Sequence, residues 1–215
     1  MLSFSLDEII AAWREAKKRE YHSPEQRAFE LAILRTLAEG RPVSPEQIAA
    51  STRLSVNAVR GIFQSLREGG ADFDAQGNLV GMVLTLIPTP HEFRVKDKQL
   101  YAWCALDTLF LPGLIGAPAD VISTCPATGA EVRLTITPEG IDSAHPAEAV
   151  LSVVVPGFSA ACKPGRPGGA QGPVCSSMHF FRDRQAASTW LVVHPDLAQL
   201  ALNEAWQLAR RVWID

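Results

Sequence analysis

Hydrophobic residues in the first 70 positions recur every three or four residues, which is the spacing of one face of an α-helix. This spacing predicts helices over residues 6–13 and 29–37. The sequence Ser-Pro-Glu-Gln at residues 44–47 is typical of a helix N-cap, and Ser55 begins another apolar helical segment. Two short helices joined by a tight turn resemble a helix-turn-helix.

A turn is predicted over residues 74–78, between two strand-like segments, where a winged helix carries its wing. Together with the preceding helices, it predicts a winged-helix-like N-terminal module over residues 1–80. A module that reads DNA needs a clearly basic face, whereas residues 1–70 contain 10 Lys and Arg against 9 Asp and Glu. We therefore favour a structural module and expect no nucleic acid partner.

The periodicity changes from residue 79 onward, where apolar residues form short runs or alternate with polar ones, as in β-strands. Strands are predicted over residues 79–87, 91–95, 121–124, 131–137, 149–155, 174–181 and 189–193. Composition predicts a turn at 125–129, a Gly- and Pro-rich loop at 156–173 and a final helix at 196–214. The fold class is thus predicted to be α+β, with a second domain of antiparallel strands and flanking helices over residues 81–215.

Composition and charge are those of an ordinary globular protein. The 215 residues are 47% hydrophobic and 20% charged, with a net charge of −3. No apolar run approaches the ~18 residues of a membrane-spanning helix, and the N-terminus lacks the apolar core of a secretory signal. We expect a cytoplasmic protein with no membrane partner, whose cysteines at 104, 125, 162 and 175 stay free thiols.

The segment over residues 100–112 is apolar except for one thiol, Cys104, and one carboxylate, Asp107. Its length and its final proline predict a helix that ends near Leu111. On a helix the two side chains share a face, whereas on a strand they point to opposite faces. Burial raises the pKa of a carboxyl group, so Asp107 would be a proton donor beside a soft nucleophile. The same spacing suits a buried thiol and a capping aspartate, and spacing alone leaves both interpretations open.

Residues 101–109, Tyr-Ala-Trp-Cys-Ala-Leu-Asp-Thr-Leu, resemble the signature of the organomercurial lyases, also called alkylmercury lyases. Further segments resemble this family in the same order, at residues 40–44, 74–81, 84–86, 125–130 and 179–181. The resemblance implies an enzyme of mercury detoxification that breaks a carbon–mercury bond by protonolysis, giving a hydrocarbon and Hg(II). It makes residues 81–215 the catalytic domain. The implied catalytic and mercury-binding residues are Cys104, Asp107 and Cys175.

The second thiol of this set is assigned to Cys175 rather than Cys162. Cys175 precedes His179 at the spacing of the family motif. Some family members carry another cysteine directly after this position, where the chain has Ser176, which does not compete for mercury. Cys162 is then either an ordinary thiol of the Gly- and Pro-rich loop or a group that captures mercury near the site.

The implied roles agree with the chemistry of the residues. Hg(II) is soft and prefers thiolate sulfur, and two thiolates make the mercury-bound carbon more basic than one does. Asp107 takes a proton from a thiol and delivers it to carbon. The resemblance implies that Hg(II) then passes to low-molecular-weight thiols or to a mercuric reductase. No organic cofactor is required, although external thiols are needed for product release.

Two other functions use the same residues. The main alternative is a non-enzymatic protein that binds or senses a soft metal, mercury or copper, through its thiols, with the N-terminal module as a DNA reader. A copper site of Cys175, Met178 and His179 is disfavoured, because adjacent strand residues point in opposite directions. A cysteine hydrolase would need a histidine base against Cys104, which the sequence does not place.

Overall fold

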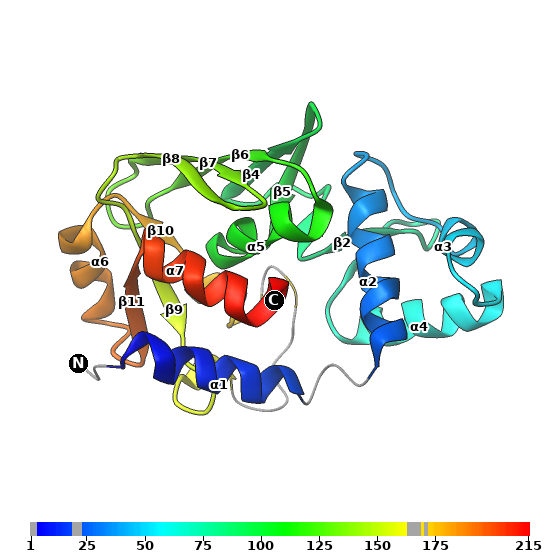
Figure 1. Cartoon of the computed structure of the whole chain (residues 1–215), viewed down its shortest axis with the longest axis horizontal. Coiled ribbons are helices and arrows are strands. Elements are labelled where there is room, and N and C mark those ends of the chain that lie inside the picture. Colours follow the sequence, from blue (N-terminus) through cyan, green and yellow to red (C-terminus); the bar gives the residue numbers. More distant parts are fainter. Residues whose placement is uncertain (1–3, 19–22, 163–168, 170–171) are drawn as a thin grey trace.

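The computed structural model describes residues 4–18, 23–162, 169 and 172–215, which form helices and two antiparallel sheets (Figure 1). This mixture confirms the predicted α+β class. None of the helices in the described residues is long and apolar enough to cross a membrane.

Four helices form the N-terminal third of the chain: α1 (Leu6–Lys18), α2 (Pro24–Leu37), α3 (Pro45–Ser51) and α4 (Val56–Glu68). The predicted cap of α3 is confirmed, because Ser44 Oγ accepts from the Gln47 main chain at 3.2 Å and Gln47 Oε1 accepts from the Ser44 main chain at 2.8 Å. Ser55 caps α4, because its hydroxyl oxygen accepts from the Ala58 main chain at 3.2 Å. Helices α2, α3 and α4 lie at one end of the molecule (Figure 1).

Helix α1 lies apart from the other three helices and runs alongside the C-terminal half of the chain (Figure 1). Trp13 Nε1 donates to the Val154 carbonyl at 3.0 Å, and the Trp13 ring lies 5.1 Å from that of Trp213. These contacts join the beginning and the end of the chain. The division at residue 80 stays a prediction.

The larger sheet has eight strands in the spatial order β1-β2-β3-β5-β4-β6-β7-β8, and neighbours pair antiparallel. The strands are β1 (Asp72–Phe73), β2 (Leu79–Met82), β3 (Leu84–Thr85), β4 (His91–Val95), β5 (Lys98–Ala102), β6 (Ala119–Thr124), β7 (Glu131–Thr137) and β8 (Gly140–His145). Strands β4, β6 and β7 alternate buried and less buried positions. This sheet therefore has one face on the core and one toward solvent.

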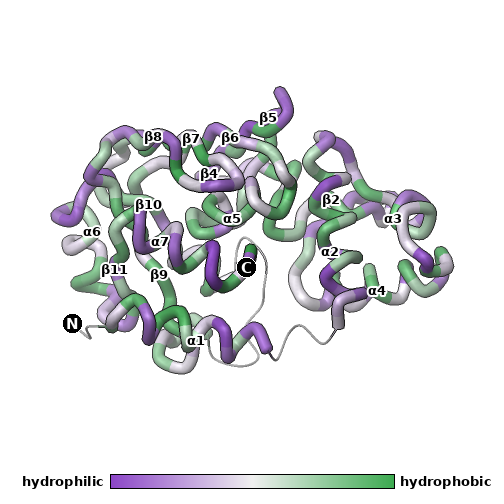
Figure 2. The backbone as a smooth tube through the Cα atoms, viewed as in Figure 1, coloured by the Kyte–Doolittle hydropathy of each residue, from purple (hydrophilic) through white to green (hydrophobic). Residues whose placement is uncertain are grey.

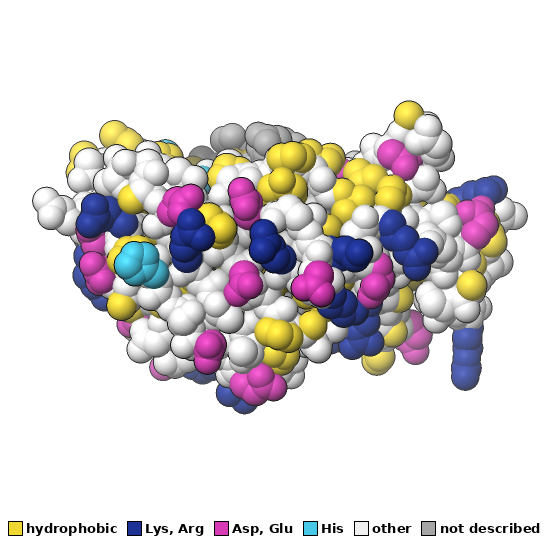
Figure 3. All heavy atoms as spheres, turned by 90° about the horizontal axis from the view of Figure 1, so that it is seen from above, with side chains coloured by type: hydrophobic (Ala, Val, Ile, Leu, Met, Phe, Trp, Pro, Cys, Tyr) yellow, Lys and Arg dark blue, Asp and Glu magenta, His cyan; other side chains and the backbone are white. Residues whose placement is uncertain are grey.

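The outer face of this sheet carries charges of both signs, which are visible from above (Figure 3). Glu92 and Arg94 on β4 lie close to Asp120 on β6 and Arg133 on β7. Opposite charges on neighbouring strands keep this face polar and leave the inner face to the hydrophobic residues.

The smaller sheet has the order β10-β9-β11, also antiparallel, with β9 (Val150–Val154) buried along its whole length. Its other strands are β10 (Phe180–Phe181) and β11 (Leu197–Ala201). The remaining helices are α5 (Ala105–Ile115), α6 (Arg184–Leu191), α7 (Leu202–Ala209) and the short η1 (Ala160–Cys162), η2 (Cys175–Ser177) and η3 (Arg210–Ile214). Helix α5 contacts strands of both sheets as well as α2 and α7. Its predominantly hydrophobic residues place it in the centre of the core (Figure 2).

The segment predicted as a helix from residue 100 is a strand followed by a helix. Residues 98–102 form β5 because they pair with β3 and β4, and the helix begins only at Ala105. Pro112 lies inside α5, which continues to a left-handed Gly116, so the predicted end near Leu111 is wrong. Burial of nearly every α5 side chain outweighs the hydrogen bond that Pro112 does not make.

Four further predictions are wrong in detail. The run over residues 79–87 forms two strands, β2 and β3, which turn back at Val83 with φ 67. Residues 189–193 are not a strand, because α6 extends to Leu191. The predicted strand at 174–181 is a 3-10 helix over Cys175–Ser177 and a strand only at Phe180–Phe181. The predicted helix at 196–214 begins as β11. In β11 the pairing with β9 overrides the helical spacing.

Candidate active site

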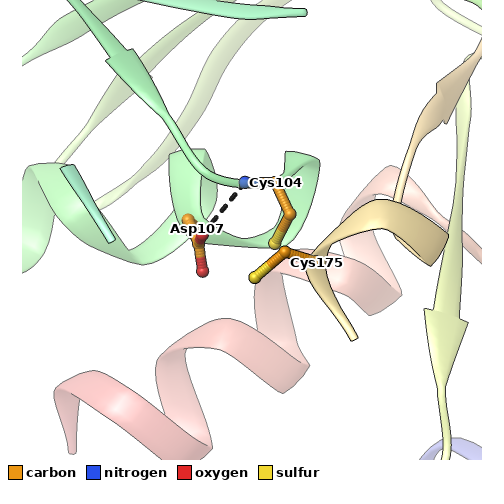
Figure 4. Close-up of side chains that lie close together, drawn as sticks. All are labelled: Cys104, Asp107 and Cys175. Carbon is orange, nitrogen blue, oxygen red and sulfur yellow. Dashed lines mark hydrogen bonds between the residues drawn. The ribbon is translucent and has the colours of Figure 1, made fainter. Parts of the chain in front are cut away.

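Three reactive side chains converge where α5 meets the segment before β10 (Figure 4). The sulfur atoms of Cys104 and Cys175 and a carboxylate oxygen of Asp107 all lie within 4.8 Å of one another. Cys104 and Asp107 are buried, and Cys175 is partly buried. Among the described residues, this is the one group of three such ligands that the structure brings together.

The start of α5 fixes the first two side chains. Cys104 is the N-cap residue, in an extended conformation directly after β5, and Asp107 is the third helical residue. The Cys104 main-chain N–H donates to Asp107 Oδ2 at 3.0 Å. Asp107 therefore caps the helix and at the same time turns its carboxyl group toward the thiol of Cys104. The spacing left open a capping aspartate or a proton donor beside the thiol, and the geometry is compatible with both roles at once.

Trp103 anchors the residue before Cys104 to the edge of the large sheet. Its main-chain N–H donates to the Val83 carbonyl at 2.8 Å, and its indole N–H donates to Asp72 Oδ2 at 3.1 Å. Gly81 on β2 pairs with Asp72, and a Cβ at Gly81 would come within 2.4 Å of Asp72 Oδ2. The glycine thus leaves room for the carboxylate that holds Trp103.

Cys175 is held by the main chain of its own short 3-10 helix, η2 (Cys175–Ser177). Ser152 on β9 fixes this turn, because its hydroxyl donates to the Ser177 carbonyl at 2.9 Å and accepts from the His179 main chain at 3.0 Å. The Ala105 main-chain N–H donates to the Met178 carbonyl at 3.2 Å. These bonds tie the turn with the second thiol to the start of α5.

Burial controls the protonation of the site. It raises the pKa of Asp107 to about 7, although hydrogen bonds from Cys104 and the positive charge of Lys17 act in the opposite direction. Burial also raises the pKa of Cys104 well above its usual value, and the hydrogen bond with Cys175 and the negative charge of Asp107 add to this effect. The Cys104 thiol therefore carries its proton at neutral pH until a metal displaces it.

Met178 and His179, which the sequence analysis weighed as copper ligands beside Cys175, are not part of this group of three. Met178 is buried, and His179 Nε2 lies 2.8 Å from the Ser176 carbonyl. The His179 ring also packs against the rings of His91 and Trp190. Most of the predicted loop between Cys162 and residue 172 lies outside the described residues.

Comparisons with known proteins identify the family. A family model described as alkylmercury lyase matches residues 84–213. An alkylmercury lyase of Staphylococcus epidermidis is 43% identical over 180 residues, which cover 84% of this chain and 79% of that protein. This chain belongs to the alkylmercury lyase family. An alkylmercury lyase of Pseudomonas putida is 35% identical over 191 residues, covering 89% of this chain and 85% of the relative.

The fold of this chain is also found in a solved structure. The crystal structure of the mercury-bound form of MerB2 superposes with a TM-score of 0.71, covering 96% of this chain and 97% of that one. Its sequence identity is 22%, so the similarity establishes a shared fold. The shared fold thus extends over the N-terminal helices as well as the sheets.

Ser152 and Lys17 are residues near the site that the sequence analysis missed. The sequence does give a signal for Ser152, because it is the one polar residue in the otherwise apolar strand Val-Leu-Ser-Val-Val, and a buried polar side chain needs a hydrogen-bond partner. Lys17 gives no such signal, since a lysine in the last turn of an exposed helix is ordinary. In the folded chain α1 packs against η3, and the Lys17 side chain is only 9% exposed.

Proposed function

We propose that this protein cleaves carbon–mercury bonds by protonolysis, with Cys104, Cys175 and Asp107 as its catalytic residues. The observation that carries the proposal is the convergence of two free thiols and a carboxyl group of raised pKa within 4.8 Å. Two sulfur atoms suit mercury, and a carboxyl group that titrates near neutral pH both accepts and donates a proton.

The reaction begins with exchange at mercury. One thiol attacks the organomercurial RHgX, forming a sulfur–mercury bond while X leaves with the thiol proton. The second thiol transfers its proton to the Asp107 carboxylate and binds mercury as a thiolate. Both sulfurs now donate electron density to mercury, which makes the bound carbon basic.

The carbon–mercury bond then breaks. Asp107 transfers its proton to carbon, the electron pair of the carbon–mercury bond forms the new carbon–hydrogen bond, and the hydrocarbon RH leaves. Hg(II) stays bound to Cys104 and Cys175, and Asp107 is again a carboxylate. In sum, one organomercurial and two thiols give RH, HX and a mercury dithiolate, so no oxidant or cofactor is consumed.

Gas chromatography tests the proposal. The purified protein is incubated with methylmercury and excess small thiol, and methane is measured beside the Asp107→Ala variant. We expect methane from the wild type and a loss of release in the variant. Tight mercury binding without methane would contradict catalysis and favour a soft-metal binding protein.

The product route and the location belong to the same proposal. Cys175 is partly exposed, so an external thiol can attack mercury from its side. We infer that Hg(II) passes to low-molecular-weight thiols or a mercuric reductase. The four free cysteines support a location in the reducing cytoplasm.

We further propose that α3, α4 and the turn before β2 form a winged-helix-like module with a structural role. Arg60 on α4 pairs with Glu46 at 2.8 Å, and Arg67 lies over the Phe73 ring. Both arginines of the would-be recognition helix thus contact the module itself, which supports a structural role over DNA binding.

A further inference from the structure

A small cavity lies beside α5, and the wall residue nearest to the helix start is Phe110, three positions after Asp107. The cavity has a volume of about 170 Å³, and its walls include Phe110 and Leu114 of α5, Leu31 and Leu34 of α2, Met82 and Trp213. We call it the α2–α5 cavity. An apolar cavity of roughly 150 Å³ holds a benzene molecule, so this one has room for an aromatic ring.

Helix geometry points this cavity at the reaction centre. Asp107, Phe110 and Leu114 are spaced i, i+3 and i+7, so they share one face of α5. The carbon that receives the proton must lie within hydrogen-bond reach of Asp107. With two sulfur atoms on mercury, the third bond, to carbon, points away from both of them, so the organic group extends away from the sulfur atoms. The face that carries Phe110 and Leu114 lies in the C-terminal direction along α5, away from Cys104.

Charged side chains line one side of the cavity. Lys17 and Arg27 line both the α2–α5 cavity and an adjoining one of about 600 Å³, which we call the α1 cavity. Arg14, Lys18 and Arg211 also line the α1 cavity, while Glu30 and Asp215 supply the carboxylates of the two walls. Lys18 pairs with Glu15 and Arg211 with Asp7, and the two cations that line both cavities are Lys17 and Arg27.

The arginine at this junction is bound by two main-chain carbonyls. Arg27 donates to the Trp213 and Ile214 carbonyls at 2.9 and 3.4 Å, and these neutral acceptors do not cancel its charge. The Lys17 ammonium lies 5.1 Å above the Trp213 ring, which itself stacks on Phe110 at 4.9 Å. The charged rim and the apolar wall are therefore parts of one packed arrangement.

We propose that the α2–α5 cavity receives the organic group of the substrate, and that the cations at its junction with the α1 cavity favour aromatic groups bearing a carboxylate. This inference rests on the proposed carbon–mercury cleavage and names its preferred substrate class. A ring in the cavity would lie against Phe110 and Trp213, and a carboxylate on the ring carbon opposite mercury would reach toward Arg27 and Lys17.

The cavity is tested by filling it. Leu114→Trp is compared with the wild type for release of benzene from phenylmercury and methane from methylmercury. We expect the phenyl-to-methyl ratio of kcat/KM to fall at least about tenfold, because a ring then lacks space. Leu54→Trp, on the exposed turn between α3 and α4, is the matched control and should keep the wild-type ratio. An unchanged ratio in Leu114→Trp would overturn the assignment of the cavity.

The charged rim is tested with 4-carboxyphenylmercury against phenylmercury. Arg27→Gln should lower the ratio of kcat/KM for these two substrates about fivefold at low ionic strength, with the difference shrinking in high salt. Arg27→Lys keeps the charge and should restore most of the preference, while Arg60→Gln on α4 is a control remote from the cavity. An equal effect of Arg27→Gln on both substrates would overturn the charge selection.

A binding measurement separates this inference from the proposed function. Crystals of the wild type are exposed to benzene, which contains no mercury. We expect benzene in the α2–α5 cavity, in contact with Phe110. Because this measurement uses the wild type, it does not depend on whether Leu114→Trp folds. An empty cavity would contradict the inference, whereas failure to release any hydrocarbon from all three organomercurials would contradict the proposed function instead.

Discussion

The pKa values of two buried thiols of this protein are shifted in opposite directions. Burial tends to raise the pKa of Cys125, but hydrogen bonds from Thr128, Arg182 and Ala127 in and near the β6–β7 turn outweigh it, so its pKa is lowered. The pKa of Cys104 is raised instead. Thiolate content alone would make Cys125 the better mercury ligand.

The surroundings of the two thiols reverse this order. Cys125 packs with apolar residues, Val150, Phe181, Ala186 and Ala187, whereas Cys104 has a second sulfur and a carboxyl group beside it. Cleavage of a carbon–mercury bond needs two sulfur donors and a proton carrier in one place. The comparison teaches that convergence of groups, rather than the acidity of one thiol, marks the candidate site.

The strongest test of this comparison removes each sulfur in turn. We expect Cys104→Ser and Cys175→Ser each to lower hydrocarbon release by at least about a thousandfold. Where catalytic residues act as a unit, removing one of them costs about as much activity as removing all of them. Release of methane from methylmercury is the measurement, and circular dichroism checks folding. Near-wild-type turnover in either variant would remove that thiol from the mechanism.

The carboxyl group is tested by Asp107→Asn, which keeps an oxygen to accept the hydrogen bond from the Cys104 main chain. We expect hydrocarbon release to fall about 10²- to 10⁴-fold, the usual contribution of a general acid. Mercury should still bind, as measured by ultraviolet absorption of the sulfur–mercury bonds. Loss of mercury binding together with turnover would show that Asp107 is mainly a ligand.

The support of the second thiol is tested by Ser152→Ala. Loss of the buried hydroxyl leaves the Ser177 carbonyl and the His179 N–H unpaired, which costs about 1–3 kcal/mol of unfolding free energy. We expect turnover to fall about tenfold as Cys175 loses its position. Ser188→Ala on α6 is the control. Equal turnover in the two variants would contradict the positioning role.

Asp107 should also make stability depend on pH. Its pKa is about 7 in the folded chain and near 3.8 when unfolded, so the folded state holds the proton more tightly. This contribution to stability is complete below about pH 3.9 and is lost as the pH rises through about 7. We expect Asp107→Asn to melt at a higher temperature than the wild type at pH 8 and to lose part of that advantage at pH 5. A constant difference between the two proteins would show that the pKa is not raised.

The smallest effects are expected at the other two thiols. Cys125→Ser should reduce the melting temperature but change turnover of the folded protein less than about twofold, since Cys125 packs in a separate cluster. Cys162→Ser should also keep most activity, because burial and the charge of Asp196 raise the pKa of its thiol to about 11. A large loss of turnover in Cys125→Ser would break the comparison between the two thiols.

The sequence predicted local structure best where the signal is local. The caps at Ser44 and Ser55 are confirmed, because each depends on residues within three positions. The strand at residues 131–137 is also confirmed, and it pairs with the strands directly before and after it in the chain. Predictions failed where a distant partner decides the structure. Leu197–Ala201 has helical spacing but pairs with β9, and Pro112 stays within a helix that the surrounding core buries.

The sequence by itself determined the residue types and the short-range relation of the site. Cys104 and Asp107 are three positions apart, and capping a helix start with both requires nothing beyond their own segment. Only the tertiary structure decided that Cys175 joins them, that Ser152 holds its turn and that Lys17 becomes buried beside them. These contacts link residues far apart in the chain, and they form because packing the core brings their elements together.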